Sequence, residues 1–216
     1  SVSNDGNKPV ITANGQHYTF DAVLYATGRK PNTANIGLEN TDITTNERGA
    51  IVVNDTCESS VPGVYAVGDV NGGPQFTYIS LDDFRIVFGA LTGNGQYTLK
   101  DRKNIPYTTF LTPPLARVGL TEEDAINKGY TVKTKEMLVA TMPRAHVNDY
   151  LKGAFKIVVN AENNLILGAT LYSQGAEELI NLIKMAMDNN IPYTYFKNQI
   201  FTHPTMAENL NDLCNF

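Results

Sequence analysis

Hydrophobic positions in the second half of the chain follow two different periods. Short apolar runs predict β-strands, and two of these runs flank the turn Glu162-Asn163-Asn164 and so predict a hairpin. An apolar face built from Leu179, Ile183, Ala186 and Met187 predicts a helix over 176–188. The pattern of residues 105–216 is therefore α+β. The predicted strands cover residues 107–111, 116–120, 131–140, 154–160 and 165–173.

Two shorter helices are predicted from their ends. Thr121 followed by Asp124 resembles a capping box, and Gly129 closes the helix that this box opens. Near the C-terminus, Pro204 suits the first position of a helix because its missing N–H needs no partner there. We therefore expect a last helix from Pro204 to about Leu213.

The first half of the chain has a different hydrophobic pattern. Asn14-Gly15 lies between two apolar runs and predicts a hairpin. Residues 20–28 form a nearly continuous apolar run of the kind found in a strand buried on both faces of an α/β sheet. One such strand cannot make a sheet, so its neighbours are missing and we expect the chain to be part of a longer protein. Residues 51–54 and 63–70 predict two more short strands.

Residues 75–91 show helical spacing. Phe76, Ile79, Ile86, Val87 and Leu91 lie near one stripe, with the charged positions 82, 83 and 85 mostly off it. The predicted helix follows directly on the strand 63–70 and the glycines after it.

Composition excludes several classes of protein. The chain has 216 residues, 42% hydrophobic and 18% charged, with a formal net charge of −5. This content supports a folded core, and the acidic balance disfavours nucleic acid and polybasic membrane attachment. No apolar run approaches the roughly 20 residues of a membrane helix, and the N-terminus lacks the pattern of a secretory signal. We expect a cytoplasmic protein with no nucleic-acid or membrane partner.

His203 and Glu208 are the first candidates for chemistry. Glu208 follows His203 by five positions, so it could fold back under the imidazole. A carboxylate bound to one ring nitrogen fixes the tautomer and raises the basicity of the other, as a general acid–base requires. The alternative is a surface histidine beside an unrelated glutamate, which is the commoner case for an isolated pair.

A second candidate is Gly68-Asp69, at the end of an apolar strand and ahead of a helix that starts near Gln75-Phe76-Thr77. Such an aspartate can accept hydrogen bonds from sugar or ribityl hydroxyls, and the helix start offers unpaired N–H groups. The alternative is an ordinary turn aspartate. A third candidate is Gly28-Arg29, where glycine permits close approach of a ligand and the arginine could bind an anion, although an exposed loop arginine is the ordinary interpretation.

Several motifs are absent from the sequence. It has no G-x-G-x-x-G and no closely spaced cysteine pair, and His17, His146 and His203 lack metal-ligand spacing. We therefore expect no metal site. Of the two cysteines, we expect Cys57 to fill apolar space and Cys214 to be a thiol in the tail.

The order of six segments resembles the C-terminal half of the class I pyridine nucleotide–disulfide oxidoreductases, the flavoproteins that include glutathione reductase, dihydrolipoamide dehydrogenase and mercuric reductase. Together the segments cover most of residues 20–213. They are YATGRKPNT, GVYAVGDV with QFTYISLDDFRIV, FLTPPLARVGLTEEDA, RAHVNDYLKGAFKIVV, LILGATLYSQGAEELI and THPTMAENL.

The resemblance implies a homodimer that uses FAD and NAD(P)H. Asp69 would hold the ribityl chain of the flavin, with Thr77 facing its pyrimidine edge. His203, paired with Glu208, would be the acid–base histidine that reaches the active site of the other subunit. The family's domain order implies that residues 1–34 end an NAD(P)H domain, 35–104 end an FAD domain, and 105–216 form a dimerisation domain, an antiparallel sheet with flanking helices.

The resemblance also limits the function. The redox cysteines and both dinucleotide fingerprints of the family are missing, so we expect this chain alone to be inactive and to hold FAD weakly. His203 favours a disulfide or other thiol-reactive substrate and disfavours mercuric ion, and residues 72–87 look like the bacterial hypothiocyanous acid reductase subgroup. The alternative function is a stand-alone dimerisation or interaction module with no redox activity, for which a ribityl-binding Asp69 would have no use.

Overall fold

A computed structural model describes residues 1–216, and the chain divides into two compact units, Ser1–Leu99 and Lys100–Phe216. The second unit is built on a five-stranded antiparallel sheet, and the first unit begins with a three-stranded one, with most of its buried residues outside that sheet. The second unit carries the larger core, and the two units are described separately below.

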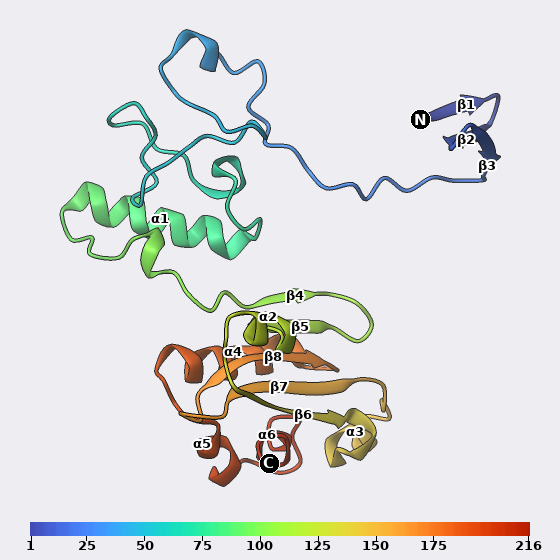
Figure 1. The fold of residues 1–216 in the computed structure, drawn as a ribbon, viewed down its shortest axis with the longest axis vertical. Coiled ribbons are helices and arrows are strands. Elements are labelled where there is room, and N and C mark those ends of the chain that lie inside the picture. Colours follow the sequence, from blue (N-terminus) through green and yellow to red (C-terminus); the bar gives the residue numbers. More distant parts are fainter. The chain divides into compact units, whose positions relative to one another are not determined.

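The second unit contains a five-stranded antiparallel sheet in the order β4-β5-β8-β7-β6 (Figure 1). The hairpin predicted around residues 162–164 joins β7 to β8, and Asn164 takes the left-handed conformation in its turn (φ 63°). The α+β prediction for this half of the chain is confirmed. The strands are β4 (Tyr107–Thr109), β5 (Leu115–Gly119), β6 (Val132–Leu138), β7 (Ala154–Asn160) and β8 (Ile166–Tyr172).

Helices flank this sheet. The predicted amphipathic helix is α4 and has the predicted bounds, and α2 begins with the predicted capping box between Thr121 and Asp124. The last helix begins at Asn209, so the prediction that it starts at Pro204 is wrong. The helices are α2 (Glu122–Asn127), α3 (Pro143–Val147), α4 (Ala176–Asp188), α5 (Tyr193–Asn198) and α6 (Asn209–Leu213), with the 3₁₀ turn η4 (Val139–Thr141).

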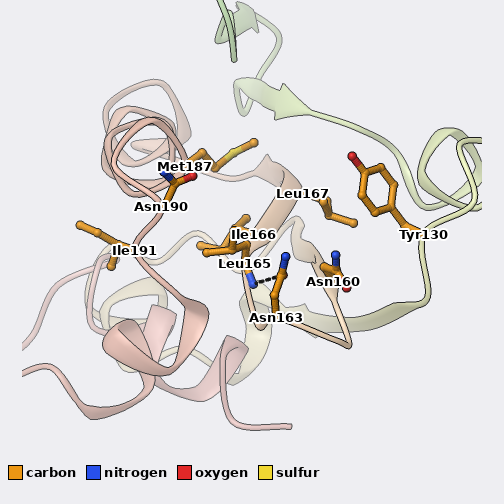
Figure 2. A pocket seen from close by; sticks show the side chains of 9 residues that line it. All are labelled: Tyr130, Asn160, Asn163, Leu165, Ile166, Leu167, Met187, Asn190 and Ile191. Atoms are coloured by element: carbon orange, nitrogen blue, oxygen red, sulfur yellow. Dashed lines mark hydrogen bonds between the residues drawn. The ribbon is translucent and has the colours of Figure 1, made fainter.

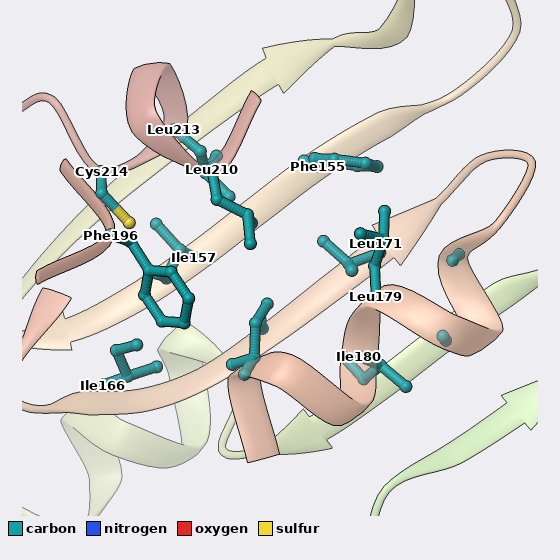
Figure 3. Close-up of a cluster of buried hydrophobic side chains, with 14 of the residues drawn as sticks. Phe155, Ile157, Ile166, Leu171, Leu179, Ile180, Phe196, Leu210, Leu213 and Cys214 are labelled. Carbon is teal, nitrogen blue, oxygen red and sulfur yellow. The ribbon is translucent and has the colours of Figure 1, made fainter. Parts of the chain in front are cut away.

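One hydrophobic core joins the sheet of the second unit to its helices (Figure 3). Phe155 and Ile157 of β7 and Leu171 of β8 are fully buried, and Ile183 of α4 and Leu213 of α6 are buried with them. The hydrophobic spacing that predicts each strand and helix also places the apolar side chains of that element on the side that faces the core. Because α6 contributes to this core, the segment that leads into it is anchored as well.

The first unit begins with a three-stranded sheet in the order β1-β2-β3. Its β2–β3 turn has Asn14 and Gly15 at positive φ, as the hairpin prediction requires (φ 51° and 74°). The elements of this unit are β1 (Val2–Asp5), β2 (Lys8–Ala13), β3 (Gln16–Thr19), α1 (Thr77–Thr92), and the 3₁₀ turns η1 (Leu38–Asn40) and η2 (Gly68–Asn71); η3 (Leu99–Asp101) spans the boundary between units.

Three predicted strands of the first half do not form. Residues 20–28 have no regular structure, and Leu24 in their middle is 90% exposed. Ile51 and Tyr65 make only isolated bridges, to Thr45 and Glu58, where strands were predicted over 51–54 and 63–70. An apolar run becomes a buried strand only when neighbouring strands pair with it. In this structure no strand of β1–β8 pairs with these segments, so the three predictions are wrong.

No helix of this chain combines the length and the hydropathy that a membrane-spanning helix needs.

Candidate functional site

The predicted contact between His203 and Glu208 forms. Nδ1 of the imidazole lies 3.0 Å from Oε1 and 3.1 Å from Oε2 of the carboxylate. The two side chains differ in accessibility, since the imidazole is 72% exposed and the carboxylate side chain only 16%. The pair is therefore a shielded carboxylate that holds an exposed imidazole.

Turns, not a helix, carry this pair. The chain from residue 204 to 208 has no helical assignment, and Pro204 follows a cis peptide bond. Thr205 and Glu208 form reciprocal hydrogen bonds, in which each backbone N–H donates to the other's side chain. These bonds close a turn just ahead of α6, which starts at Asn209.

The geometry fixes which nitrogen of His203 carries the proton. An ionised carboxylate only accepts hydrogen bonds, so a neutral imidazole must donate from Nδ1. Nε2 is then left without a proton and can take one from a reacting group. Such an arrangement suits general acid–base chemistry on a partner that reaches this surface.

Gly68 and Asp69 lie in η2. Gly68 is buried and has φ 71°, and a Cβ at this position would collide with Ser80 of α1. Only glycine fits there, because both the backbone conformation and the space exclude a side chain. Asp69, next in the chain, is exposed. The packing of Gly68 thus places Asp69 at the surface of the first unit.

Asp83 holds this turn from the helix side. It is fully buried, and its Oδ2 accepts the N–H of Gly68 at 2.7 Å and Nδ2 of Asn71 at 2.9 Å. The sequence pattern placed Asp83 mostly off the apolar stripe, which is wrong. Asp83 is buried together with Ile79 and Ile86, and the spacing 79–83–86 was the signal that could have identified it.

The start of α1 has open N–H groups. Phe76 is the N-cap and supplies no side-chain cap, so the N–H groups of Thr77 and Tyr78 precede the first intrahelical bond. Gln75, Phe76 and Thr77 are all exposed. The structure thus presents Asp69 and the start of α1 on the same unit, one short segment apart in sequence.

Gly28 and Arg29 are not brought into a site. Both lie in exposed coil, and a Cβ at Gly28 would meet nothing within 4 Å. The positive φ of Gly28 (91°) remains typical of a glycine turn.

Both cysteines are buried. Cys57 is fully enclosed, as the filler interpretation expected. Cys214 belongs to the main core, and burial raises the pKa of its thiol to about 12. The prediction of a thiol in the tail is therefore wrong, because α6 packs Cys214 against the sheet.

A small pocket of about 140 Å³ lies where the β7–β8 turn meets the end of α4 (Figure 2). Amide side chains of Asn160, Asn163 and Asn190 surround an apolar floor that includes Ile166 and Met187. It contains none of the predicted site residues.

Two protein-family models match this chain. Residues 105–214 match the family model of the pyridine nucleotide-disulphide oxidoreductase dimerisation domain, and residues 1–83 match the pyridine nucleotide-disulphide oxidoreductase model. The chain is 45% identical over 212 residues to the probable pyridine nucleotide-disulfide oxidoreductase RclA of Escherichia coli, covering 98% of this chain and 48% of that protein.

Two further comparisons agree. A solved structure of the HOCl-induced flavoprotein disulfide reductase RclA from Escherichia coli has a TM-score of 0.93 and covers 99% of this chain and 49% of its own. Mercuric reductase of Staphylococcus aureus is 37% identical over 93% of this chain and 37% of that protein. The chain thus spans about half the length, or less, of the relatives it matches. Since the dimerisation-domain model alone accounts for residues 105–214, this chain belongs to the pyridine nucleotide-disulphide oxidoreductase family.

Proposed function

We propose that this chain supplies the dimer interface and the acid–base pair of an FAD- and NAD(P)H-dependent disulfide reductase. The observation that carries the proposal is the contact of His203 with Glu208, in which a shielded carboxylate orients an exposed imidazole. Thiol–disulfide exchange develops charge on sulfur, and an imidazole can stabilise a thiolate and protonate a leaving thiol. Nε2 of His203 is the nitrogen that would do so.

The flavin-side residues fit an FAD-binding role. Gly68 lets η2 pack closely on Ser80 of α1, Asp69 presents a carboxylate for hydroxyl groups, and α1 presents open N–H groups at Thr77. When bound, the flavin would pass electrons between a nicotinamide and sulfur. Asp69 would hold the ribityl chain, and the N–H at Thr77 would bind the pyrimidine edge.

The nicotinamide-side residues give less support. Gly28 and Arg29 form no cradle in this structure, so no step is assigned to them. We retain residues 1–34 as the end of an NAD(P)H domain, 35–104 as part of an FAD domain and 105–216 as the dimerisation domain. The division of the chain after Leu99 and the family match from residue 105 support the second of these boundaries.

We further propose a two-fold homodimer and a disulfide or other thiol-reactive substrate, with hypothiocyanous acid as the candidate that the pattern of residues 72–87 suggests. The match to a dimerisation domain supports the homodimer, because closed two-fold dimers are the commonest oligomers. Mercuric ion is disfavoured despite the similarity to mercuric reductases. The tail of this chain has the single cysteine Cys214, and that thiol is buried.

The test uses the protein produced from the complete reading frame that contains this chain. His203→Gln should slow the thiol–disulfide half-reaction by about 10²–10⁴-fold, the usual contribution of a general acid–base, while NAD(P)H reduces the flavin at an unchanged rate. The control is His146→Gln, which alters another exposed histidine, one bound to the carbonyl of Ala140. An unchanged thiol–disulfide half-reaction in His203→Gln would remove His203 from the mechanism.

We also propose that the 216-residue chain by itself neither turns over substrate nor holds FAD tightly. It lacks the cysteine pair and the dinucleotide fingerprints that this chemistry needs. A flavin absorbance band in the purified chain would contradict this.

A further inference from the structure

Thr205 connects the segment that precedes His203 with the carboxylate that holds it. Its backbone N–H donates to Oε2 of Glu208 at 3.2 Å, and its Oγ1 accepts the N–H of Glu208 at 3.2 Å. The same hydroxyl donates to the carbonyl of Thr202 at 2.8 Å. Thr205 thus forms hydrogen bonds both to Thr202, which precedes His203 in the sequence, and to Glu208, which follows it.

The carboxylate of Glu208 is held by these contacts. Only 16% of its side chain is exposed, so few water molecules can replace a lost partner. One oxygen faces His203 and the other lies between His203 and Thr205. Asn209 fixes Thr205 in turn, because its Nδ2 donates to the carbonyls of Thr205 and Met206.

We propose that Thr205 is a positioning residue for the histidine: its hydroxyl holds residues 202–208 in the turn that keeps Glu208 on Nδ1 of His203 and leaves Nε2 without a proton. Loss of the hydroxyl frees the N–H of Glu208 and the carbonyl of Thr202 together. The carboxylate then samples other positions, and the imidazole adopts the Nε2–H tautomer that a free side chain prefers. The importance of this tautomer for catalysis rests on the proposed function, but the tautomer itself does not.

A purely structural role for Thr205 makes a different prediction. A capping box stabilises a helix start wherever it occurs. The start of α2 has the same pair of reciprocal hydrogen bonds, in which Oγ1 of Thr121 accepts the N–H of Asp124 at 3.0 Å and Asp124 accepts the N–H of Thr121 at 3.3 Å. Thr121→Val is therefore the matched control, because it removes the same hydrogen-bond pattern without touching the histidine.

The experiment measures the tautomer of His203 in the 216-residue chain by ¹⁵N chemical shifts of the imidazole, at a pH where the ring is neutral. Signals of the other histidines are assigned with His17→Gln and His146→Gln. The wild-type chain should show mainly Nδ1–H. Thr205→Val should shift the population towards Nε2–H, Thr205→Ser should restore it, and Thr121→Val should leave it unchanged.

Two outcomes would overturn the proposal: a folded Thr205→Val chain with the wild-type tautomer, or an equal shift in Thr121→Val. If Thr205→Val does not fold, Thr205→Ala gives the same test with a smaller side chain. A wrong proposed function would give a different set of results. In that case the Thr205 variants shift the tautomer as expected, but His203→Gln leaves the thiol–disulfide half-reaction of the complete protein unchanged.

Discussion

The turn that presents Asp69 depends on a buried carboxylate, and Asp83→Ala tests this dependence. The substitution removes the acceptor that Gly68 and Asn71 share. Because Gly68 is buried, its N–H would have no water to replace the lost partner. We expect the turn to open more often while α1 remains helical, since alanine favours a helix.

The size of the effect follows from the hydrogen bond to Gly68, which is 2.7 Å long and has a carboxylate as its acceptor. A hydrogen bond to a charged group contributes about 1.5–3 kcal/mol. Each ~1.4 kcal/mol changes an equilibrium constant about tenfold. The opening equilibrium of the turn should therefore increase roughly 10- to 100-fold in Asp83→Ala.

The assay is amide hydrogen exchange at Gly68, read by NMR in the isolated chain. Exchange through local opening reports the opening equilibrium directly, so the protection factor should fall by the same ratio. Asp82→Ala is the control, because it removes an equal charge one position earlier, where the carboxylate accepts from Tyr97. Wild-type protection of Gly68 in Asp83→Ala, or an equal loss in both variants, would refute the reasoning.

Two further predictions concern the second unit. Cys214 should resist a thiol reagent in the native chain at about pH 8 and react once urea unfolds it, because its pKa is raised to about 12 by burial; stoichiometric native labelling of Cys214, with Cys57→Ser to isolate it, would contradict this. At Asp188, burial acts to raise the pKa, but hydrogen bonds from Lys184 and Asn104 outweigh burial and lower it. Its stabilisation should be complete above the unfolded pKa of about 4 and be lost as pH falls through the lower folded pKa. Urea midpoints measured between about pH 5 and pH 2 should show this loss, and Asp188→Asn should reduce it.

Some features of this protein were determined by its sequence alone. The five strands of residues 105–216 and the helix α4 follow from apolar patterns within each segment, whereas the start of α6 does not. The contact of His203 with Glu208 was a candidate from their spacing, although an unrelated pair was the commoner case, and the turn between Thr205 and Glu208 decided it. Resemblance to the oxidoreductase family followed from the order of short segments, which needs no coordinates.

Other features were decided only by the tertiary structure. Residues 20–28 have the sequence of a buried strand, yet a strand needs partners, and the described chain pairs none with them. Aspartate is usually a surface residue. In this structure the turn η2 packs against α1, and its donors Gly68 N–H and Asn71 Nδ2 satisfy the buried carboxylate of Asp83. The sequence around Cys214 predicts an exposed tail residue, because no local pattern indicates that α6 packs on the sheet. For Asp83 and Cys214 the deciding contacts join residues that are not neighbours in the sequence, and for residues 20–28 no strand of the structure supplies such a contact.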